Sequence, residues 1–299
     1  MRRPFIDFMG KRNYLFAVSA VVLTVAIGAL IFKPLNLGID FKGGTVITLT
    51  NVSGATIAQV RDAAAAAGVV GAEVQATERG YIVRSTETKT VAAEQEASAM
   101  AAALKVAQTD RQVSTIGPEW GGNITNAAML ALAVSIIAIL VYISIRFEYK
   151  MAVTGVIALV HDAVITLGIY ALIGREVTPN TVAALLTILG YSLYDTIVVF
   201  HRIRENTQNL SKSTFMDMAN QSLNQVLARW INTGLSSLIP VLCLLFFGGE
   251  TLRDFAFALT VGLISGAYSS VAVASPLYAM WKEREPRFMA LRKKFATVK

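Results

Sequence analysis

The chain has 299 residues, of which 54% are hydrophobic and 16% are charged. Soluble domains usually carry about 25% charged residues, so this composition excludes an ordinary water-soluble protein and indicates a membrane protein. The net charge of +7 does not indicate a nucleic-acid partner, because the basic residues gather at the edges of apolar segments, where topology and contact with membrane lipid account for them.

Six apolar segments are long enough to cross a bilayer as helices, which takes at least about 18 residues. They are residues 14–33, 126–145, 151–173, 180–200, 226–247 and 255–281. The first segment follows a basic start, but FKPLNLG comes after it in place of a small-residue cleavage site, which predicts a retained anchor. Six crossings place both termini on one side of the membrane.

The distribution of lysine and arginine predicts which side that is. The terminal segments 1–13 and 282–299, with the loops on their side, carry 16 of these residues, whereas the short opposite loops carry Arg175 and Arg253. Under the positive-inside rule, the termini are therefore cytoplasmic and the long segment 34–120 is exported.

The exported segment alternates between strand-like and helical patterns. Strands are predicted at 45–50, in a hairpin over 72–85 and at 112–116, with helices at 56–68 and 90–106. The order β-α-β-β-α-β predicts a ferredoxin-like α+β domain. Because this domain shows no catalytic constellation, binding or docking is its expected role.

Residues 121–281 are predicted to form a bundle of five transmembrane helices, followed by the basic cytoplasmic tail 282–299. Most connections in the bundle are short. The exception is 201–225, a polar stretch with a weak helical period, which predicts a short amphipathic helix lying at the membrane interface.

Four ionisable residues fall inside the apolar segments: His161, Asp162, Asp195 and Arg229. Charges are costly in lipid, so each is expected to face protein or water. With a rise of about 1.5 Å per residue, Asp195 and Arg229 lie at similar depths and can form an ion pair. Protonation of Asp195 would break that pair and could move helices; the alternative is a static pair that fixes helix register. Asp162 lies deeper and, with His161, is either a second proton-handling element or a structural hydrogen bond.

Hydroxyl groups accompany these charges. Tyr191 and Ser192 precede Asp195 by four and three residues and so share its helix face, and Thr233 and Ser236 follow Arg229 on the next segment. These four residues predict a polar path for protons through the bundle. The alternative is that small hydroxyl residues allow close helix packing.

Other chemistries lack their motifs. The chain has two histidines, one cysteine and no HExxH, CxxC or GxxxxGK[ST] sequence, so we expect no metal, no cofactor and no enzymatic activity. An aspartyl protease would need Asp162 and Asp195 close together, and their different depths disfavour it.

The stretch DFKGG follows the first apolar segment. Gly43 and Gly44 free the backbone for a tight turn, and Asp40 can accept hydrogen bonds from the amides of that turn. A rigid joint between the anchor and the first strand is the favoured interpretation, and contact with a substrate is the alternative.

Five stretches, taken in order, resemble the SecF family of bacterial protein-export membrane subunits. They are LNLGIDFKGGTVI (35–47), HDAVITLG (161–168), GYSLYDTIVVFHRIREN (190–206), SLNQVLARWINTGLSSL (222–238) and FFGGETLRDFAFALTVGLISGAYSSVAVASPL (246–277). The resemblance implies half of an RND-like bundle in the bacterial inner membrane. It also implies that the subunit pairs with SecD, associates with the SecYEG channel, with YajC and YidC as further candidate partners, and uses the proton gradient to help move preproteins.

The resemblance also assigns residue roles. Asp195 and Arg229 match the family's proton-coupling residues, and DFKGG matches its glycine signature. Two positions depart from the family pattern: His201 stands where aspartate is usual, and Trp230 where threonine is usual. The route by which protons leave near His201 is therefore open.

Two other functions compete with a proton-driven export subunit. One is a self-sufficient exporter of small molecules or lipids, which a six-segment half with one modest exported domain disfavours. The other is a passive scaffold for the channel, in which Asp195 would only fix helix register.

Overall fold

The computed structural model describes residues 6–52, 54–69, 71–77 and 79–295. The chain divides into two compact units, one formed by Met1–Asn36 with Ala131–Lys299 and the other by Leu37–Leu130. Within the described residues, six helical stretches are long and apolar enough to cross a membrane. The six helices predicted from the apolar segments are therefore confirmed as helices.

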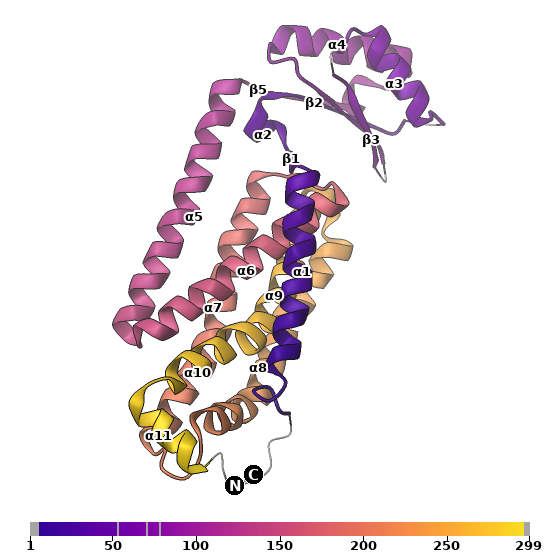
Figure 1. Ribbon diagram of the computed structural model, residues 1–299. Coiled ribbons are helices and arrows are strands. Elements are labelled where there is room, and N and C mark those ends of the chain that lie inside the picture. Colours follow the sequence, from indigo (N-terminus) through magenta and orange to yellow (C-terminus); the bar gives the residue numbers. More distant parts are fainter. Residues whose placement is uncertain (1–5, 53, 70, 78, 296–299) are drawn as a thin grey trace. The chain divides into compact units, whose positions relative to one another are not determined.

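The larger unit is helical (Figure 1). Its elements are α1 (Arg12–Phe32), the end of α5 (Pro118–Arg146), α6 (Tyr149–Ile173), β6 (Glu176–Val177), α7 (Pro179–Gln208), α8 (Phe215–Phe247), α9 (Gly249–Ser269), the π-helical segment η2 (Ser270–Ala274), α10 (Ser275–Glu283) and α11 (Pro286–Phe295). The strand β1 (Asn36–Leu37) lies at the boundary of the two units.

Local sequence sets the helix boundaries. Helix α6 ends at Gly174, whose φ of 75° is a left-handed conformation that glycine adopts without strain. Helix α7 begins at Pro179, behind a capping interaction between Thr178 and Thr181. Helix α8 begins behind Thr214, whose hydroxyl accepts a hydrogen bond from the Asp217 amide.

The predicted interfacial helix in 201–225 is wrong. Helix α7 continues to Gln208 and α8 begins at Phe215, so that the connection is short and both helices extend beyond their apolar segments. Phe215, Met218 and Leu223, which gave the segment its helical period, are buried in the core of the bundle. The apolar face of this stretch therefore packs on protein and not on lipid.

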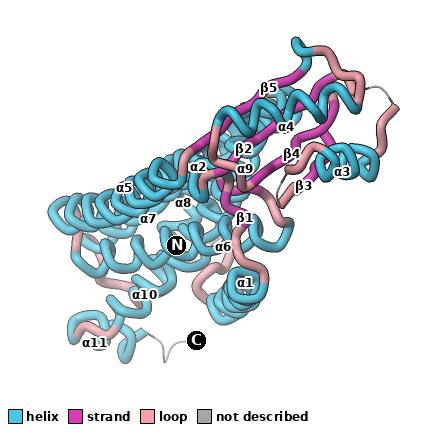
Figure 2. Tube along the Cα trace, turned by 90° about the horizontal axis from the view of Figure 1, so that it is seen from above, coloured by secondary structure: helices cyan, strands magenta, loops and turns pink. Residues whose placement is uncertain are grey.

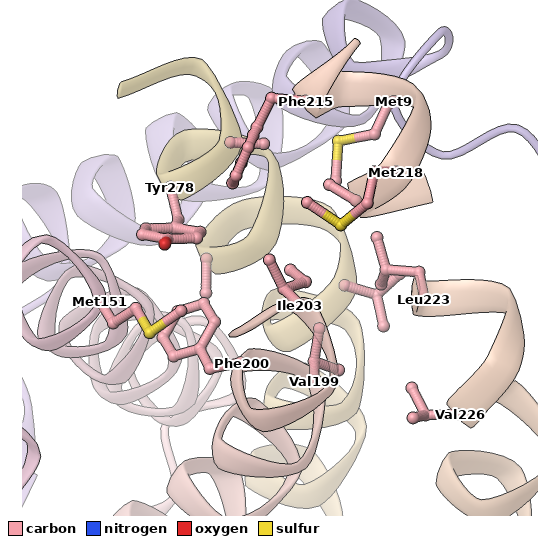
Figure 3. Packing of buried hydrophobic residues seen from close by; sticks show 14 of the residues in the cluster. Met9, Met151, Val199, Phe200, Ile203, Phe215, Met218, Leu223, Val226 and Tyr278 are labelled. Atoms are coloured by element: carbon pink, nitrogen blue, oxygen red, sulfur yellow. The ribbon is translucent and has the colours of Figure 1, made fainter. Parts of the chain in front are cut away.

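That core joins α7, α8 and α10. Ile203 of α7 lies between Tyr278 of α10 and Met218 of α8 (Figure 3). The Phe200 ring, also on α7, packs 5.4 Å from the Tyr278 ring. The Phe215 ring packs 6.0 Å from Tyr278 and 4.8 Å from Phe288 of α11, measured between ring centroids. Large aromatic side chains bury much apolar area, so this cluster holds the ends of the bundle together.

An ion-pair cluster ties α6 to α10 and to the connection that follows it. Lys150 Nζ lies 2.7 Å from Glu285 Oε1, and Lys282 Nζ lies 2.6 Å from Glu148 Oε2 and 3.0 Å from Glu285 Oε1. Both lysines are buried. Burial alone would raise the pKa of Glu285, but hydrogen bonds from Lys150 and Lys282 outweigh it and lower that pKa. The cluster fixes this end of α6.

Helix α1 packs closely on α6 at a glycine. A Cβ atom placed on Gly168 would lie 2.4 Å from Ala26 Cβ and 2.6 Å from Ala26 Cα. Small residues at a helix crossing let backbones approach closely in a membrane. The absence of a side chain at Gly168 is thus what lets α1 lie against the bundle.

The smaller unit contains α2 (Ile39–Lys42), β2 (Gly44–Thr50), α3 (Ile57–Ala66), β3 (Glu73–Thr77), β4 (Gly80–Ser85), α4 (Thr90–Ala103), η1 (Gln108–Asp110), β5 (Arg111–Ile116) and the start of α5. The four strands lie together with α3 and α4 beside them (Figure 2). Their order is β3-β4-β2-β5, with every neighbouring pair antiparallel.

The core of this unit lies between the sheet and the two helices. Ile47, Leu49 and Val83 from the strands meet Val60 of α3 and Met100 of α4, and all five are fully buried. Each strand and helix predicted from the pattern over 45–116 is present, with boundaries shifted by up to three residues.

The glycines of DFKGG occupy conformations that other residues rarely adopt. Gly43 has φ 75° and Gly44 has φ 130°. A Cβ atom on Gly44 would lie 2.6 Å from the Ser85 carbonyl oxygen, and one on Gly121 would lie 2.6 Å from that of Phe41. The tight turn predicted between the anchor and the first strand is therefore present directly before β2, after the short helix α2, and its backbone is packed closely. Asp40 lies half-buried on α2.

A carboxyl group in this unit predicts a pH effect on its stability. Glu96 Oε2 on α4 is buried and has no hydrogen-bond partner among the residues that the structure describes. Burial, with Glu87 as a smaller cause, raises the pKa of Glu96. A raised pKa in the folded state means that stability is greatest below the unfolded-state pKa and falls as the pH rises through the folded-state value.

We therefore expect Glu96→Gln to stabilise the smaller unit at neutral pH by at most about 1 kcal/mol, because solvent still reaches part of the side chain. The gain should disappear as the pH falls below the usual glutamate range. Amide hydrogen exchange of β2 and β4 in the full chain measures it, with Glu73→Gln, at an exposed glutamate on β3, for comparison. Equal effects of the two substitutions at every pH would contradict the assignment of the pH effect to the Glu96 carboxyl group.

Candidate functional site

The centre of the helical unit holds a fully buried carboxylate, Asp162 of α6, with an exposed fraction of 0%. Ser265 Oγ donates to its Oδ1 at 2.7 Å, and His161 Nδ1 lies 3.1 Å from the same oxygen. Ser192 Oγ and Ser269 Oγ donate to its Oδ2 at 2.7 and 2.8 Å. Three helices, α6, α7 and α9, therefore meet at one carboxyl group.

This hydrogen bonding matches the capacity of an ionised carboxylate. Each oxygen has two acceptor positions, and each is occupied by two groups in this cluster. A charge buried in a membrane protein is tolerated where polar groups of the bundle surround it. The three serine hydroxyls and His161 therefore give both oxygens of Asp162 polar neighbours from the bundle.

The hydroxyl network continues from α7 into η2. Thr196 Oγ1 lies 2.9 Å from Ser270 Oγ, and Thr196 also donates to the Ser192 carbonyl at 3.1 Å. Ser275 Oγ donates to the Ser270 carbonyl at 2.7 Å. Short π-helical segments occur often at functional sites, and this one begins immediately after Ser269.

Asp195 lies on the same helix as Ser192 but faces a small cavity. The cavity has a volume of about 20 Å³. A cavity needs roughly 10–15 Å³ to hold one water molecule, so there is room for one. It lies between α7, α8 and α9, and its walls are Tyr191, Ser192, Tyr194, Asp195, Thr233, Gly234, Ser237, Leu263, Gly266 and Ala267. Asp195 has no hydrogen-bond or ion-pair partner among the described residues.

The expected ion pair between Asp195 and Arg229 is not formed within the described part of the chain. Arg229 is exposed on α8, and Asp195 is half-buried against the cavity. Residue counting predicts a similar depth for the two residues along their helices, but depth does not determine which way each helix face points. Proton coupling by either residue stays a prediction.

Three of the four predicted path residues line this cavity. Tyr191, Ser192 and Thr233 contribute to its wall, together with Ser237. Ser236 does not, because its side chain is exposed and donates to the Thr233 carbonyl at 2.9 Å. Gly266 allows α9 to approach α7 here, since a Cβ atom at that position would lie 2.8 Å from Ser192 Cβ.

Ser192 connects the cavity to the buried carboxylate. It lines the cavity beside Asp195 and donates to Asp162, so the two acidic residues share one neighbour. Ser265 and Ser269 were not singled out from the sequence as partners of Asp162. Their spacing of four residues, which places both hydroxyls on one helix face, was the available signal.

His161 and Tyr268 lie at the other edge of the cluster. The two rings stack with centroids 6.4 Å apart, and Tyr268 donates to the Leu15 carbonyl at 2.7 Å. His161 Nε2 is buried and has no hydrogen-bond partner in the described chain. His161 therefore contacts Asp162 through one nitrogen and keeps the other free.

The two residues that depart from the family pattern lie in different surroundings. His201 is exposed near the end of α7. Trp230 is partly buried against the main core, and its indole nitrogen is buried without a hydrogen-bond partner among the described residues. Neither contacts Asp162.

Known proteins match this chain over nearly its full length. Residues 96–284 match the family described as protein export membrane protein SecD/SecF, C-terminal, and residues 28–50 match the SecD/SecF GG motif. The chain is 40% identical to the protein translocase subunit SecF of Streptomyces coelicolor, over 96% of this chain and 80% of that protein. It is 38% identical to SecF of Calditerrivibrio nitroreducens, over 94% and 96%.

A solved structure gives the same result. The crystal structure of SecDF, a translocon-associated membrane protein from Thermus thermophilus, superposes with a TM-score of 0.87 at 36% identity. The match covers 94% of this chain and 39% of that chain. This chain therefore corresponds to one part of the longer SecDF protein.

Long apolar helices and the match to SecDF define a polytopic helical membrane protein, and the translocase subunits that it resembles indicate a transport role. Within that class, the chain belongs to the SecD/SecF family and is a protein translocase subunit of the SecF type. The resemblance found in the sequence is confirmed, and an independent exporter is not favoured. Asp40, Gly43 and Gly44 lie within the matched GG motif.

Proposed function

We propose that this subunit couples the proton gradient to a late step of preprotein translocation, with Asp195 as the residue that takes up and releases the proton. The observation that carries the proposal is the position of Asp195. It is a partly desolvated carboxylate in a water-sized cavity between three helices, without a fixed partner among the described residues. Such a group can change its charge without first losing an ion pair. Protons are then the coupling ion, and no cofactor takes part.

The partner of this subunit in translocation is a SecD-type chain. In the SecDF protein both names belong to one chain, of which this chain covers 39%, so a separate SecD would supply the remainder. Arg229 supports such a contact, because an exposed guanidinium inside an apolar helix needs a protein or water partner. A groove of about 340 Å³ beside it, formed by α8 and α9 and including Trp230 and Tyr268, offers an apolar surface for a neighbouring helix. The SecYEG channel, YajC and YidC are further partners under this proposal.

The membrane arrangement follows from the charge distribution. We place the chain in the bacterial inner membrane with both termini cytoplasmic, and the smaller unit on the exported side as a ferredoxin-like domain. The strand order β3-β4-β2-β5 supports that classification, because it is the order of a split β-α-β unit. The domain would contact the preprotein or its partner subunits.

Complementation tests the proposed function. A bacterium depleted of its own SecF should recover secretion of a periplasmic reporter when it produces this chain together with the matching SecD. The recovery should be lost when an ionophore collapses the proton gradient. Gentle purification should recover SecD with the chain. A chain that purifies alone and transports a small molecule in liposomes would overturn the proposal.

Arg229→Lys tests the partner contact. We expect normal protein levels, because Arg229 is exposed, but weaker recovery of SecD and reduced gradient-dependent secretion. Lysine keeps the charge but lacks the planar fork that binds a carboxylate through two hydrogen bonds. Arg146→Lys, at an exposed position that ends α5, serves as the matched control. Equal behaviour of the two variants would exclude Arg229 from the contact.

A further inference from the structure

We infer that Asp162 is a second proton-binding carboxylate and that Ser192 passes the proton to it from the Asp195 cavity. The inference rests on the proposed function, because it extends the route of the proton that Asp195 takes up. It adds a relay residue and a second site on another helix, and it gives the serines of α9 a role beyond packing.

The geometry places Ser192 between the two carboxyl groups. Its hydroxyl donates to Asp162 Oδ2 at 2.7 Å, and the same residue lines the cavity together with Asp195. The cavity has room for one water molecule, and the carboxylate and hydroxyl groups in its wall can hydrogen-bond it. A hydroxyl group both donates and accepts hydrogen bonds, so Ser192 can accept from that water while it donates to Asp162.

The transfer balances in protons and bonds. Asp195 gives its proton to the cavity water, the water gives one to Ser192 Oγ, and the original Ser192 proton moves to Asp162 Oδ2. One O–H bond breaks and one forms at each oxygen along the way, so that the water and Ser192 end unchanged. Asp195 becomes ionised and Asp162 becomes neutral.

The cluster can accommodate a neutral Asp162. Protonation of Oδ2 reverses its hydrogen bond with Ser192, whose oxygen then accepts from the new O–H group. The protonated oxygen is a weaker acceptor for Ser269, whose Oγ also lies 3.3 Å from the Gly266 carbonyl oxygen. Proton uptake would thus weaken the contact that Ser269 makes between α9 and α6.

Few other charged groups face Asp162. On its own helix the neighbouring titratable group is His161, which contacts Oδ1. Helix α7 contributes Asp195 on the far side of Ser192, and α9 contributes Tyr268, which stacks on His161. In α1, Arg12 and Tyr14 lie in the first turn, and η2 contains no ionisable residue. In α10, Tyr278 lies in the apolar core, and Lys282 and Glu283 end the helix. Among the described residues, Asp195 is therefore the neighbouring carboxyl group from which a proton can come.

Two serines provide a matched test. Ser192 and Ser265 each donate one hydrogen bond of 2.7 Å to Asp162, but Ser192 lines the Asp195 cavity whereas Ser265 lines a separate apolar groove with His161. A purely structural role for the cluster predicts equal effects of Ser192→Ala and Ser265→Ala. A relay predicts that the first is far more damaging, and that Ser192→Thr, which keeps the hydroxyl, restores function.

The experiment uses the full chain with its SecD in liposomes. Infrared difference spectra between high and low pH should contain two protonating carboxyl signals, one lost in Asp195→Asn and the other in Asp162→Asn. Ser192→Ala should slow proton uptake at the Asp162 signal, and gradient-dependent translocation, by at least about tenfold relative to Ser265→Ala. Equal rates in the two alanine variants, or no carboxyl signal lost in Asp162→Asn, would overturn the inference.

The two proposals fail in different ways in this experiment. Full gradient-dependent translocation by Asp195→Asn would overturn the proposed function. If Asp195→Asn loses translocation but Ser192→Ala and Ser265→Ala have equal rates of proton uptake and translocation, only the relay would be overturned. If Asp162→Asn does not fold, the Ser192 and Ser265 comparison still decides, because each of those variants removes a single hydroxyl.

Discussion

Asp195→Asn should abolish the gradient-dependent part of secretion while leaving protein level and SecD association unchanged. Asparagine has nearly the same shape as aspartate, but its amide cannot take up or release a proton. Asp195 has no hydrogen-bond or ion-pair partner among the described residues, so the substitution breaks no contact that holds the bundle together. Removal of a partly desolvated charge should, if anything, stabilise the helices.

The measurement is secretion of a reporter in cells that depend on this chain, with and without an ionophore. Asp195→Glu is the matched variant, because it keeps a titratable carboxyl group and adds one methylene to a cavity of about 20 Å³. It should retain part of the gradient response. Unimpaired secretion by Asp195→Asn would contradict proton coupling by Asp195 and would favour the passive scaffold function.

Gly168→Ala should detach α1 from the bundle. The new Cβ atom would lie 2.4 Å from Ala26 Cβ and 3.0 Å from the Ala26 carbonyl carbon. These atoms belong to the backbone or are fixed to it, so no side-chain rotation relieves the clash. Overpacking of this kind costs about 1–3 kcal/mol, and the thermal midpoint of the purified protein in detergent should fall accordingly.

Gly28→Ala on α1 is the matched control. A Cβ atom at Gly28 would have no neighbour within 4 Å, and alanine favours the helix over glycine by roughly 0.5–1 kcal/mol. The control should leave the midpoint unchanged or raise it. A cysteine pair across α1 and α6, introduced after replacement of Cys243, should cross-link in Gly28→Ala but not in Gly168→Ala. Equal midpoints for the two variants would show that α1 is not held at Gly168.

Much of the fold was predictable because its signals are long and local. Each of the six apolar segments predicts a helix, and the change between strand-like and helical patterns over 45–116 predicts the strands and helices of the smaller unit. The error in 201–225 has a physical reason. Phe215, Met218 and Leu223 produce the same helical period whether the helix lies on lipid or packs on protein, and their burial depends on α7 and α10.

The site was less predictable for a related reason. Counting residues gives the depth of a side chain in the membrane, and it predicts Asp195 and Arg229 at one level, but it does not give the rotation of each helix. Asp162 was recognised as a candidate, yet its donors Ser265 and Ser269 look like ordinary small packing residues in sequence. Only tertiary packing shows which serines bind a carboxylate.

The ion-pair cluster at the beginning of α6 has a mechanical consequence. Helix α6 is held at two points. Serine hydroxyls of α9 hold it at Asp162, and the salt bridges Lys150–Glu285 and Glu148–Lys282 hold its beginning to α10 and the residues after it. Twelve residues of helix, or about 18 Å, separate the two points on α6. If the fastening at Asp162 opens while the one at Lys150 holds, α6 can pivot about its fixed end but cannot slide. A small displacement at Asp162 would then produce a larger displacement at the end of α6 near Ile173, because that end lies farther from the fixed point.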